Sequence, residues 1–207
     1  RNTGVNQDGS TQGIAAPNGD SQLALIEKVY AEAGLTAADI DVVEAHGTGT
    51  QAGDTTECAA LARVVSRFPR QQKLVIGSVK TNIGHLEAAA GIAGLIKASL
   101  MVERGQVLPN IHFETPNPKI PFDKMEIRVP TSEENWPTEN RTKRASVNSF
   151  GYGGTNAHAV VESFDAIDSA APTQERCADS KPCPEINSAT LILPITAQDE
   201  TALRKLA

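Results

Sequence analysis

The chain of 207 residues contains 40% hydrophobic and 21% charged residues, a composition that supports a packed globular core and argues against gross disorder. Its net charge of −6 argues against a dedicated nucleic-acid binder, which carries a basic patch or stripe. The longest apolar run, residues 91–100, is interrupted by Gly94 and Lys97 and is shorter than the roughly 20 apolar residues that a membrane helix needs.

The three cysteines, Cys58, Cys177 and Cys183, are too few to predict a disulfide framework. We therefore expect reduced thiols and a cytoplasmic location. No further cysteine or histidine near Cys177 and Cys183 completes a zinc pattern, so no metal site is predicted. Because the chain starts at Arg1 rather than at Met, we also expect it to be a piece of a longer protein.

The first hundred residues alternate between predicted helices and strands. Residues 1–20 are rich in Asn, Gly, Thr and Asp, which predicts a loop. Apolar residues at helical spacing then predict three helices: from Ser21, as the N-cap, to Gly34; from Asp54 or Thr55 to Pro69; and from about His85 to Glu103. Short apolar runs predict buried strands at 41–46 and 73–78. This alternation indicates a layered α/β domain.

After the third predicted helix the pattern changes. Residues 108–122 are Pro-rich and irregular, and three further strands are predicted at 125–129, 145–149 and 156–162. Residues 165–189 are rich in Ala, Pro, Ser and Asp, which predicts a flexible linker before a new strand–helix unit begins at 190–207. We therefore expect one domain over residues 1–164.

The first of three segments that carry chemistry is His46-Gly47-Thr48-Gly49-Thr50. A histidine at a strand end can project its ring into a cleft. The glycines that follow let a ligand approach the backbone, and the hydroxyls can bond a polar ligand arm. A Gly/Thr turn with a capping histidine explains the same pattern equally well.

The second segment, residues 78–85, puts Lys80 and His85 around the turn between a buried strand and a helix rich in Gly and Ala. Near the N-terminus of that helix, the positive end of the helix dipole would disfavour a charged His85. A neutral imidazole is the form that donates a hydrogen bond to a developing oxyanion. Lys80 by itself also fits an ordinary surface lysine.

The third segment, residues 148–158, places three glycines between two strands. Such a tight loop can point its backbone amides at an anionic oxygen. It lacks the lysine and the following Ser or Thr of a phosphate-binding loop, and Gly-rich turns are common. Of the other histidines, His112 is predicted at the surface and His158 in a structural role.

These three segments, in this order and spacing, resemble the β-ketoacyl synthases, or ketosynthases. Val5-Asn-Gln-Asp-Gly and Ala16-Pro-Asn-Gly are similar to the branch found in modular type I polyketide synthases. Asp54-Thr-Thr-Glu is most similar to fungal, highly reducing enzymes. The resemblance covers residues 1–164 and implies the thiolase-like α/β fold, of which this chain would be mainly the C-terminal βαβαβαββ half. Residues 190–207 would begin the linker toward an acyltransferase domain.

The catalytic triad of this family is Cys-His-His. The resemblance assigns its histidines to His46 and His85. The cysteine belongs to an Asp-Thr-Ala-Cys-Ser-Ser segment of the first half, which this sequence does not contain. Cys58 is not a substitute, because nothing around it in the predicted helix would lower the pKa of its thiol, so a structural role is predicted.

The resemblance implies decarboxylative Claisen condensation of malonyl-acyl carrier protein with a cysteine-bound acyl chain. His46 and His85 would donate to the enolate oxygen, and Lys80 would orient and tune them. The remaining implied roles are an oxyanion hole with an acyl gate at Phe150, Gly151 and Tyr152, and phosphopantetheine contacts at Thr48 and Thr50.

No directly bound cofactor is expected, because the substrate would arrive on the 4′-phosphopantetheine of an acyl carrier protein domain. That domain, the adjacent acyltransferase domain and a second ketosynthase in a homodimer are the implied partners. A non-condensing relative, which decarboxylates or sets chain length, stays an alternative. The residue at the nucleophile position of the first half separates the two, since Cys favours a synthase and Gln or Gly the alternative. Thiolases and chalcone-type enzymes share the fold but lack these motifs.

Overall fold

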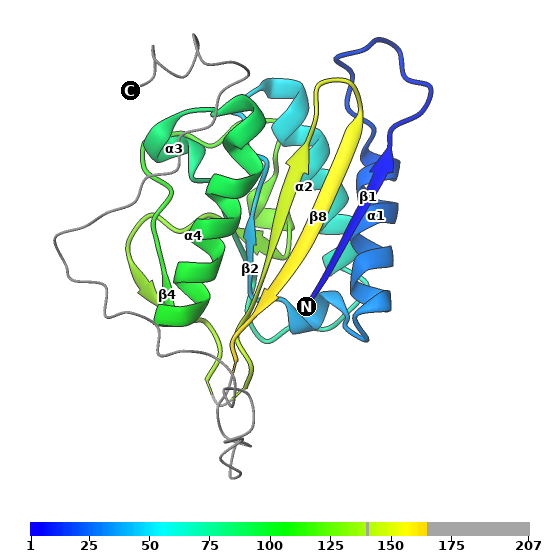
Figure 1. Ribbon diagram of the computed structural model, residues 1–207. Helices are drawn as coiled ribbons and strands as arrows, with labels where there is room; N and C mark the ends of the chain where they lie inside the picture. The colour runs from blue at the N-terminus through cyan, green and yellow to red at the C-terminus, as the bar shows by residue number, and fades with distance from the viewer. Residues whose placement is uncertain (140, 165–207) are drawn as a thin grey trace, which may run out of the picture. The chain divides into compact units, whose positions relative to one another are not determined.

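The computed structural model describes residues 1–139 and 141–164 and is built on a mixed six-stranded sheet (Figure 1). The strands lie in the order β1 (Asn2–Gln7), β8 (Thr155–Glu162), β7 (Arg144–Phe150), β2 (Val42–Glu44), β3 (Leu74–Gly77) and β5 (Ile127–Arg128). The last four are parallel to one another, and β8 runs antiparallel to both β7 and β1. A separate antiparallel pair joins β4 (Gln106–Val107) to β6 (Glu134–Asn135).

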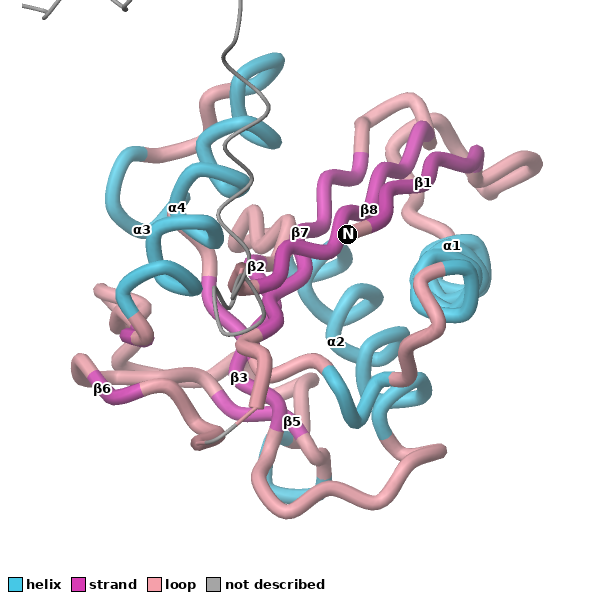
Figure 2. Tube along the Cα trace, turned by 60° about the horizontal axis from the view of Figure 1, so that its bottom comes forward, coloured by secondary structure: helices cyan, strands magenta, loops and turns pink. Residues whose placement is uncertain are grey.

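Helices cover both faces of the sheet. On one face α1 (Gly19–Glu32) and α2 (Gln51–Val65) pack against each other, and on the other α4 (Ala90–Arg104) lies against β2 and β7 (Figures 1 and 2). A short helix, α3 (Lys80–Ile83), precedes α4. Three single 3₁₀ turns complete the set: η1 (Ala37–Asp39), η2 (Glu87–Ala89) and η3 (Phe122–Lys124). Among residues 1–139 and 141–164, no helix is both long and apolar enough to cross a membrane.

Each face of the sheet has its own apolar core. Leu25 and Ile26 of α1 and Leu61 of α2 are almost fully buried in the first core. In the second core, Ala98, Met101 and Val102 of α4 pack on β2, β3 and β7. In each helix the buried apolar residues recur at helical spacing, so their burial follows from the period of the apolar residues in the sequence.

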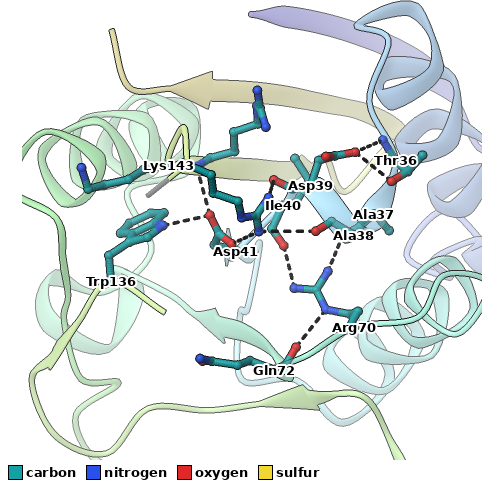
Figure 3. A network of polar contacts seen from close by, with 12 residues as sticks. Thr36, Ala37, Ala38, Asp39, Ile40, Asp41, Arg70, Gln72, Trp136 and Lys143 are labelled. Atoms are coloured by element: carbon teal, nitrogen blue, oxygen red, sulfur yellow. Dashed lines mark hydrogen bonds and ion pairs between the residues drawn. The ribbon is translucent and has the colours of Figure 1, made fainter. Parts of the chain in front are cut away.

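A polar network anchors the start of β2, at the end opposite His46 (Figure 3). The Asp41 carboxylate, buried to 1% exposure, accepts the Trp136 indole N–H at 2.8 Å and pairs with the Arg141 guanidinium. Arg70 donates to the carbonyls of Ala37 and Ile40, the latter at 2.7 Å. A buried carboxylate is stable only with such partners, so these contacts hold the strand that ends at the site described below.

Three boundaries differ from the sequence predictions. Residues 2–7 form β1 rather than a loop, because β8 supplies hydrogen-bond partners more than 140 residues away, with Asn2 opposite Val160. The N-cap of α1 is Asn18 rather than Ser21, since the Asn18 side chain accepts from two backbone amides. Helix α2 begins at Gln51, where Thr50 supplies the cap, rather than at Asp54 or Thr55.

The helix predicted from about His85 to Glu103 begins later, at Ala90. Gly84, at a φ of +74°, ends α3, and η2 follows before α4 begins at Ala90. His85 therefore lies in the connection between two helices. The argument that the dipole of the long helix keeps this imidazole neutral is wrong, because the effect fades within the first turn. The other predicted strands are found, with β2, β3 and β5 shorter than expected.

Candidate active site

His46 leaves the end of β2 in a loop that a buried carboxylate holds in place. Glu57 of α2, 3% exposed, accepts the backbone N–H groups of His46 at 2.8 Å and Gly47 at 3.0 Å. It also accepts the Asn148 side-chain amide of β7 at 2.8 Å. Burial raises the pKa of Glu57, and these three hydrogen bonds oppose that rise. The loop that presents His46 is thus tied to both α2 and β7.

The glycine after His46 has no room for a side chain. Gly47 has a φ of +47°, and a Cβ atom there would lie 2.8 Å from Cβ of Ser78. Farther along the loop, Thr48 and Thr50 share a hydrogen bond of 3.1 Å between their hydroxyls. Thr50 also accepts the Gly53 N–H at 3.1 Å as the cap of α2. The close fit explains why the motif needs small residues between its polar ones.

Lys80 begins α3, directly after the turn that leaves β3. In that turn the Ser78 N–H bonds Asn110 Oδ1 at 2.9 Å, and the Val79 N–H bonds Glu44 Oε1 at 2.5 Å. Burial lowers the pKa of Lys80, while the nearby carboxylates, first among them Glu44, raise it. Two side chains from other elements therefore set the position of this lysine.

His85 is held in one tautomer by its own loop. Its Nδ1 accepts the Glu87 backbone N–H at 2.8 Å, which an imidazolium cannot do because both of its nitrogens donate. The ring proton is consequently on Nε2. Glu87 adopts a φ of +50°, a left-handed conformation that is costly for a residue with a side chain and is found most often at functional sites.

The two imidazoles lie together. The ring centroids of His46 and His85 are 5.5 Å apart in an edge-to-face arrangement, and Phe150 lies 5.9 Å from His46. Burial lowers the pKa of His46 to about 4, and the positive charge of Lys80 adds to the effect. At neutral pH His46 is thus uncharged, and with Nδ1 of His85 accepting the Glu87 N–H, each imidazole is able to donate one hydrogen bond.

A cavity of about 670 Å³ contains this pair. Seven of the eight predicted site residues line it: His46, Thr48, Thr50, His85, Phe150, Gly151 and Tyr152. Lys80 is the exception, although its charge acts on His46. Phe150 is 8% exposed and Tyr152 is 73% exposed, so one aromatic ring is fixed in the wall and the other stands at the loop tip.

Three sequence predictions about other residues are confirmed. Cys58 is buried, and burial beside Glu57 and Asp54 raises the pKa of its thiol, the reverse of what a nucleophile needs. His158 is 2% exposed and bonds Asn148 Oδ1 at 2.6 Å, while His112 is exposed. Cys177 and Cys183 lie outside the described residues.

Sequence reasoning missed the residues that hold the site, chiefly Glu44, Glu57, Lys97 and Asn110. The available signal was a charged side chain inside an apolar pattern. Glu44 interrupts the strand after two valines, and Lys97 interrupts the longest apolar run. A charged side chain at a buried position needs a partner of opposite charge or a hydrogen-bond partner. For Glu44 that partner, Lys97, is distant in the sequence.

The sequence matches the family "Beta-ketoacyl synthase, C-terminal domain" over residues 1–114. The chain belongs to the β-ketoacyl synthase family. Residues 116–207 match a second family, "Ketoacyl-synthetase C-terminal extension". The predicted family membership is thereby confirmed. The predictions of a linker at 165–189 and of a further unit at 190–207 concern residues outside the described structure and stay predictions.

Relatives of this ketosynthase chain occur in fungi and bacteria. It is 47% identical to the highly reducing polyketide synthase Preu1 of Preussia isomera, over 100% of this chain and 8% of that protein. It is 58% identical to the highly reducing polyketide synthase tstA of Talaromyces stipitatus, over 78% of this chain and 6% of that protein. The chain thus spans less than a tenth of these relatives.

A solved structure has the same fold. The ketosynthase from module 6 of the bacillaene synthase of Bacillus subtilis 168 superimposes with a TM-score of 0.76 at 42% identity. The match covers 80% of this chain and 30% of that one. The predicted thiolase-like α/β fold is confirmed by this likeness. The observed order begins with the expected alternation of strands and helices, but in the described residues the short strands β4, β5 and β6 stand between α4 and the final pair β7 and β8.

Proposed function

We propose that this chain provides the two-histidine part of a ketosynthase active site that performs decarboxylative Claisen condensation in a polyketide synthase. The observation that carries the proposal is the pair of adjacent, uncharged imidazoles of His46 and His85 in one cavity. Two neutral N–H donors aimed at one place suit an oxygen that becomes negative during a reaction.

The chemistry follows from where that charge develops. A cysteine of the first half holds the growing chain as a thioester. In the malonyl thioester the bond to the carboxylate breaks, CO₂ leaves, and the electron pair passes into an enolate whose oxygen His46 and His85 stabilise. The enolate carbon then attacks the acyl carbonyl and the cysteine thiolate leaves. Lys80 tunes the pair through its charge.

The glycine loop supplies a second oxyanion site in this proposal. The Gly151 N–H closes the loop by bonding the Thr155 carbonyl at 2.7 Å, whereas among the described residues the Tyr152 N–H has no partner. The Tyr152 amide therefore receives the oxyanion of the tetrahedral intermediate at the acyl-cysteine. Phe150 and Tyr152 gate the acyl pocket, and Thr48 and Thr50 contact the phosphopantetheine arm.

The partners follow from the same chemistry. Malonyl would arrive on the 4′-phosphopantetheine of an acyl carrier protein domain, loaded by an adjacent acyltransferase domain. A second ketosynthase in a homodimer and a cytoplasmic location complete the proposal. The names of the relatives support a polyketide synthase as the setting, because several are highly or partially reducing polyketide synthases or hybrids with a peptide synthetase.

The test is to separate decarboxylation from acyl loading in the intact synthase. His46→Ala and His85→Ala should each lower CO₂ release from malonyl carrier protein by roughly 100- to 1,000-fold, the usual cost of one oxyanion donor. Radiolabelled acyl loading of the cysteine should fall much less, because its oxyanion forms at the backbone amide. The two losses should not add fully, since both donors serve one oxygen. Lys80→Ala should be milder.

His112→Ala is the matched control, because it removes an exposed imidazole away from the cavity that holds His46 and His85. It should leave both steps unchanged. CO₂ release at the unaltered rate from His46→Ala or His85→Ala would show that the assigned roles are wrong. CO₂ release without any acylation of the synthase would instead identify the non-condensing alternative.

A further inference from the structure

A buried ion pair lies directly behind the catalytic segments. Lys97 Nζ of α4 is 2.8 Å from Glu44 Oε2 of β2, and the two side chains are 9% and 2% exposed. The pair is set beside the apolar core that α4 forms with β2, β3 and β7. Replacing such a pair by apolar residues of similar volume is often neutral or stabilising, so stability alone is a weak reason for two charges here.

The pair connects elements that lie next to the three catalytic residues in the sequence. Glu44 stands two positions before His46 on the same strand. Its other oxygen, Oε1, accepts the N–H of Val79, the residue before Lys80, at 2.5 Å. Lys97 comes from α4, the helix that follows the His85 connection. One carboxylate therefore joins the strand that leads to His46, the turn that leads to Lys80 and the helix that follows the His85 connection.

The packing leaves little freedom for these elements to move independently. A Cβ atom on Gly94 would lie 3.1 Å from Cγ of Glu44, so α4 approaches β2 as closely as a glycine permits. On the other side of the turn, Asn110 Oδ1 holds the Ser78 N–H at 2.9 Å. With the turn clamped from two directions, a change at Glu44 must be transmitted to Lys80 or absorbed by the strand that ends at His46.

We propose that Glu44 and Lys97 are positioning residues, which set the mutual placement of His46, Lys80 and His85 for decarboxylation; this inference rests on the function proposed above. Glu44 holds the Val79 amide, and Lys97 keeps Glu44 ionised and in place. Neither touches the reacting atoms. A displacement of about 1 Å in a catalytic group can cost roughly 100-fold in rate, so a small shift of the turn suffices.

The first experiment compares two ion pairs on the same strand of the intact synthase. Lys97→Met should lower CO₂ release from malonyl carrier protein by about 10- to 100-fold while acyl loading of the cysteine stays within about threefold. Arg141→Met makes the same change beside Asp41, the buried carboxylate at the opposite end of β2. It should lower thermal stability to a similar degree and leave the ratio of the two steps unchanged.

The second experiment separates the hydrogen bond from the charge. Glu44→Gln with Lys97→Met keeps an oxygen for the Val79 N–H and carries no charge, so CO₂ release should return to within about threefold of the unaltered synthase. Glu44→Leu with Lys97→Met has similar volume but no acceptor, and it should remain at least about tenfold slower. This comparison holds even where Lys97→Met alone does not fold.

The pH dependence of CO₂ release distinguishes a positioning role of Glu44 and Lys97 from a purely structural one. The charged groups that face Glu44 are Lys97 of α4 and Lys80 of α3, and burial raises the pKa of Glu44 against their pull. Without Lys97 the carboxylate takes up a proton at higher pH. The neutral acid keeps an oxygen for the Val79 N–H, as Gln does, whereas the carboxylate without Lys97 is a buried unpaired charge. CO₂ release by Lys97→Met should therefore fall as pH rises through that pKa, and the Gln-containing double variant should not show this additional pH dependence.

Two results overturn the inference. One is that Lys97→Met behaves like Arg141→Met, with both steps changed in proportion. The other is that the Gln and Leu double variants release CO₂ at the same rate. If His46→Ala loses CO₂ release and these variants do not, only the positioning roles are wrong. If His46→Ala also keeps CO₂ release, the proposed function is wrong and the positioning roles fall with it.

Discussion

At the scale of single residues, the positions of the two histidines depend on hydrogen bonds with Glu57 and Glu87. His46 lies where it does because Glu57 accepts two successive backbone amides, and His85 presents Nε2–H because Glu87 occupies its other nitrogen. Burial favours the neutral form of His46, and a hydrogen bond to Nδ1 fixes the tautomer of His85. Both arrangements provide N–H donors that are already in place when negative charge develops on a bound oxygen.

Gly47 is the residue at which the loop is most sensitive. In the intact synthase Gly47→Ala should destabilise the ketosynthase by more than the roughly 1–2 kcal/mol of a left-handed Cβ, because the new atom also meets Ser78 at 2.8 Å. CO₂ release should fall with it, since His46 is the adjacent residue. The measurement is the temperature of half-inactivation together with the rate of decarboxylation.

Gly49→Ala isolates the strain from the clash. Gly49 has a φ of +76°, but a Cβ atom there would meet nothing within 4 Å, so its substitution should show the conformational cost alone. Equal losses for Gly47→Ala and Gly49→Ala would mean that the contact with Ser78 relaxes without consequence and that the close fit of the loop is unimportant.

At the scale of elements, α4 supports the site from the opposite face of the sheet to α1 and α2. It packs on β2 and β7, contributes Lys97 to Glu44, and follows the connection that carries His85. Gly94 is the residue that lets the helix approach, since a Cβ there would lie 3.1 Å from Glu44 and 3.4 Å from Val147. Glycine in a helix interior generally costs propensity, so a close contact is the physical reason to keep one here.

Gly94→Ala should therefore lower both stability and CO₂ release, even though alanine favours a helix interior by about 1 kcal/mol over glycine. The clash falls on a buried ion pair that cannot move aside without breaking hydrogen bonds. Ser99→Ala on the exposed side of the same helix is the control and should change little. A stabilised Gly94→Ala synthase with normal CO₂ release would show that the helix has room to shift.

At the scale of the whole molecule, the residues that the structure describes include a row of exposed large apolar side chains. Ile92, Ile96 and Leu100 lie on one face of α4 and are 42–55% exposed, and Ile83 and Leu86 are exposed just before that helix. Contiguous apolar surface of this kind marks a contact with another part of a protein or with a partner. The match covers only 30% of the solved ketosynthase, which supports a covering segment from the rest of the domain.

The isolated chain should consequently associate through this row, bind a hydrophobic dye and unfold without a cooperative transition. It should also form no condensation product, because Cys58 is buried and its thiol pKa is raised. Light scattering, calorimetry and mass spectrometry after incubation with malonyl carrier protein check these outcomes. Ile92→Gln with Ile96→Gln should reduce the association. A monodisperse, cooperatively unfolding monomer, or an acylated Cys58 with product, would contradict the prediction.

The sequence by itself determined the local features of this protein. Apolar runs placed β2, β3 and β7, helical spacing placed α1 and most of α2, and the order of three polar segments identified the family. These features depend on neighbouring residues, so a short window contains the information. The buried places of Cys58 and His158 followed for the same reason.

Only the tertiary structure decided how the site is held. Strand β1 exists because β8 pairs with it, Asn148 meets Glu57 across 91 residues, and Lys97 meets Glu44 across 53. The late start of the third predicted helix at Ala90, which leaves His85 in a connection, was likewise visible only in the structure. A charged residue within an apolar segment indicates that a buried partner is needed. Which residue becomes the partner depends on how distant elements pack, and a local sequence pattern does not contain that information.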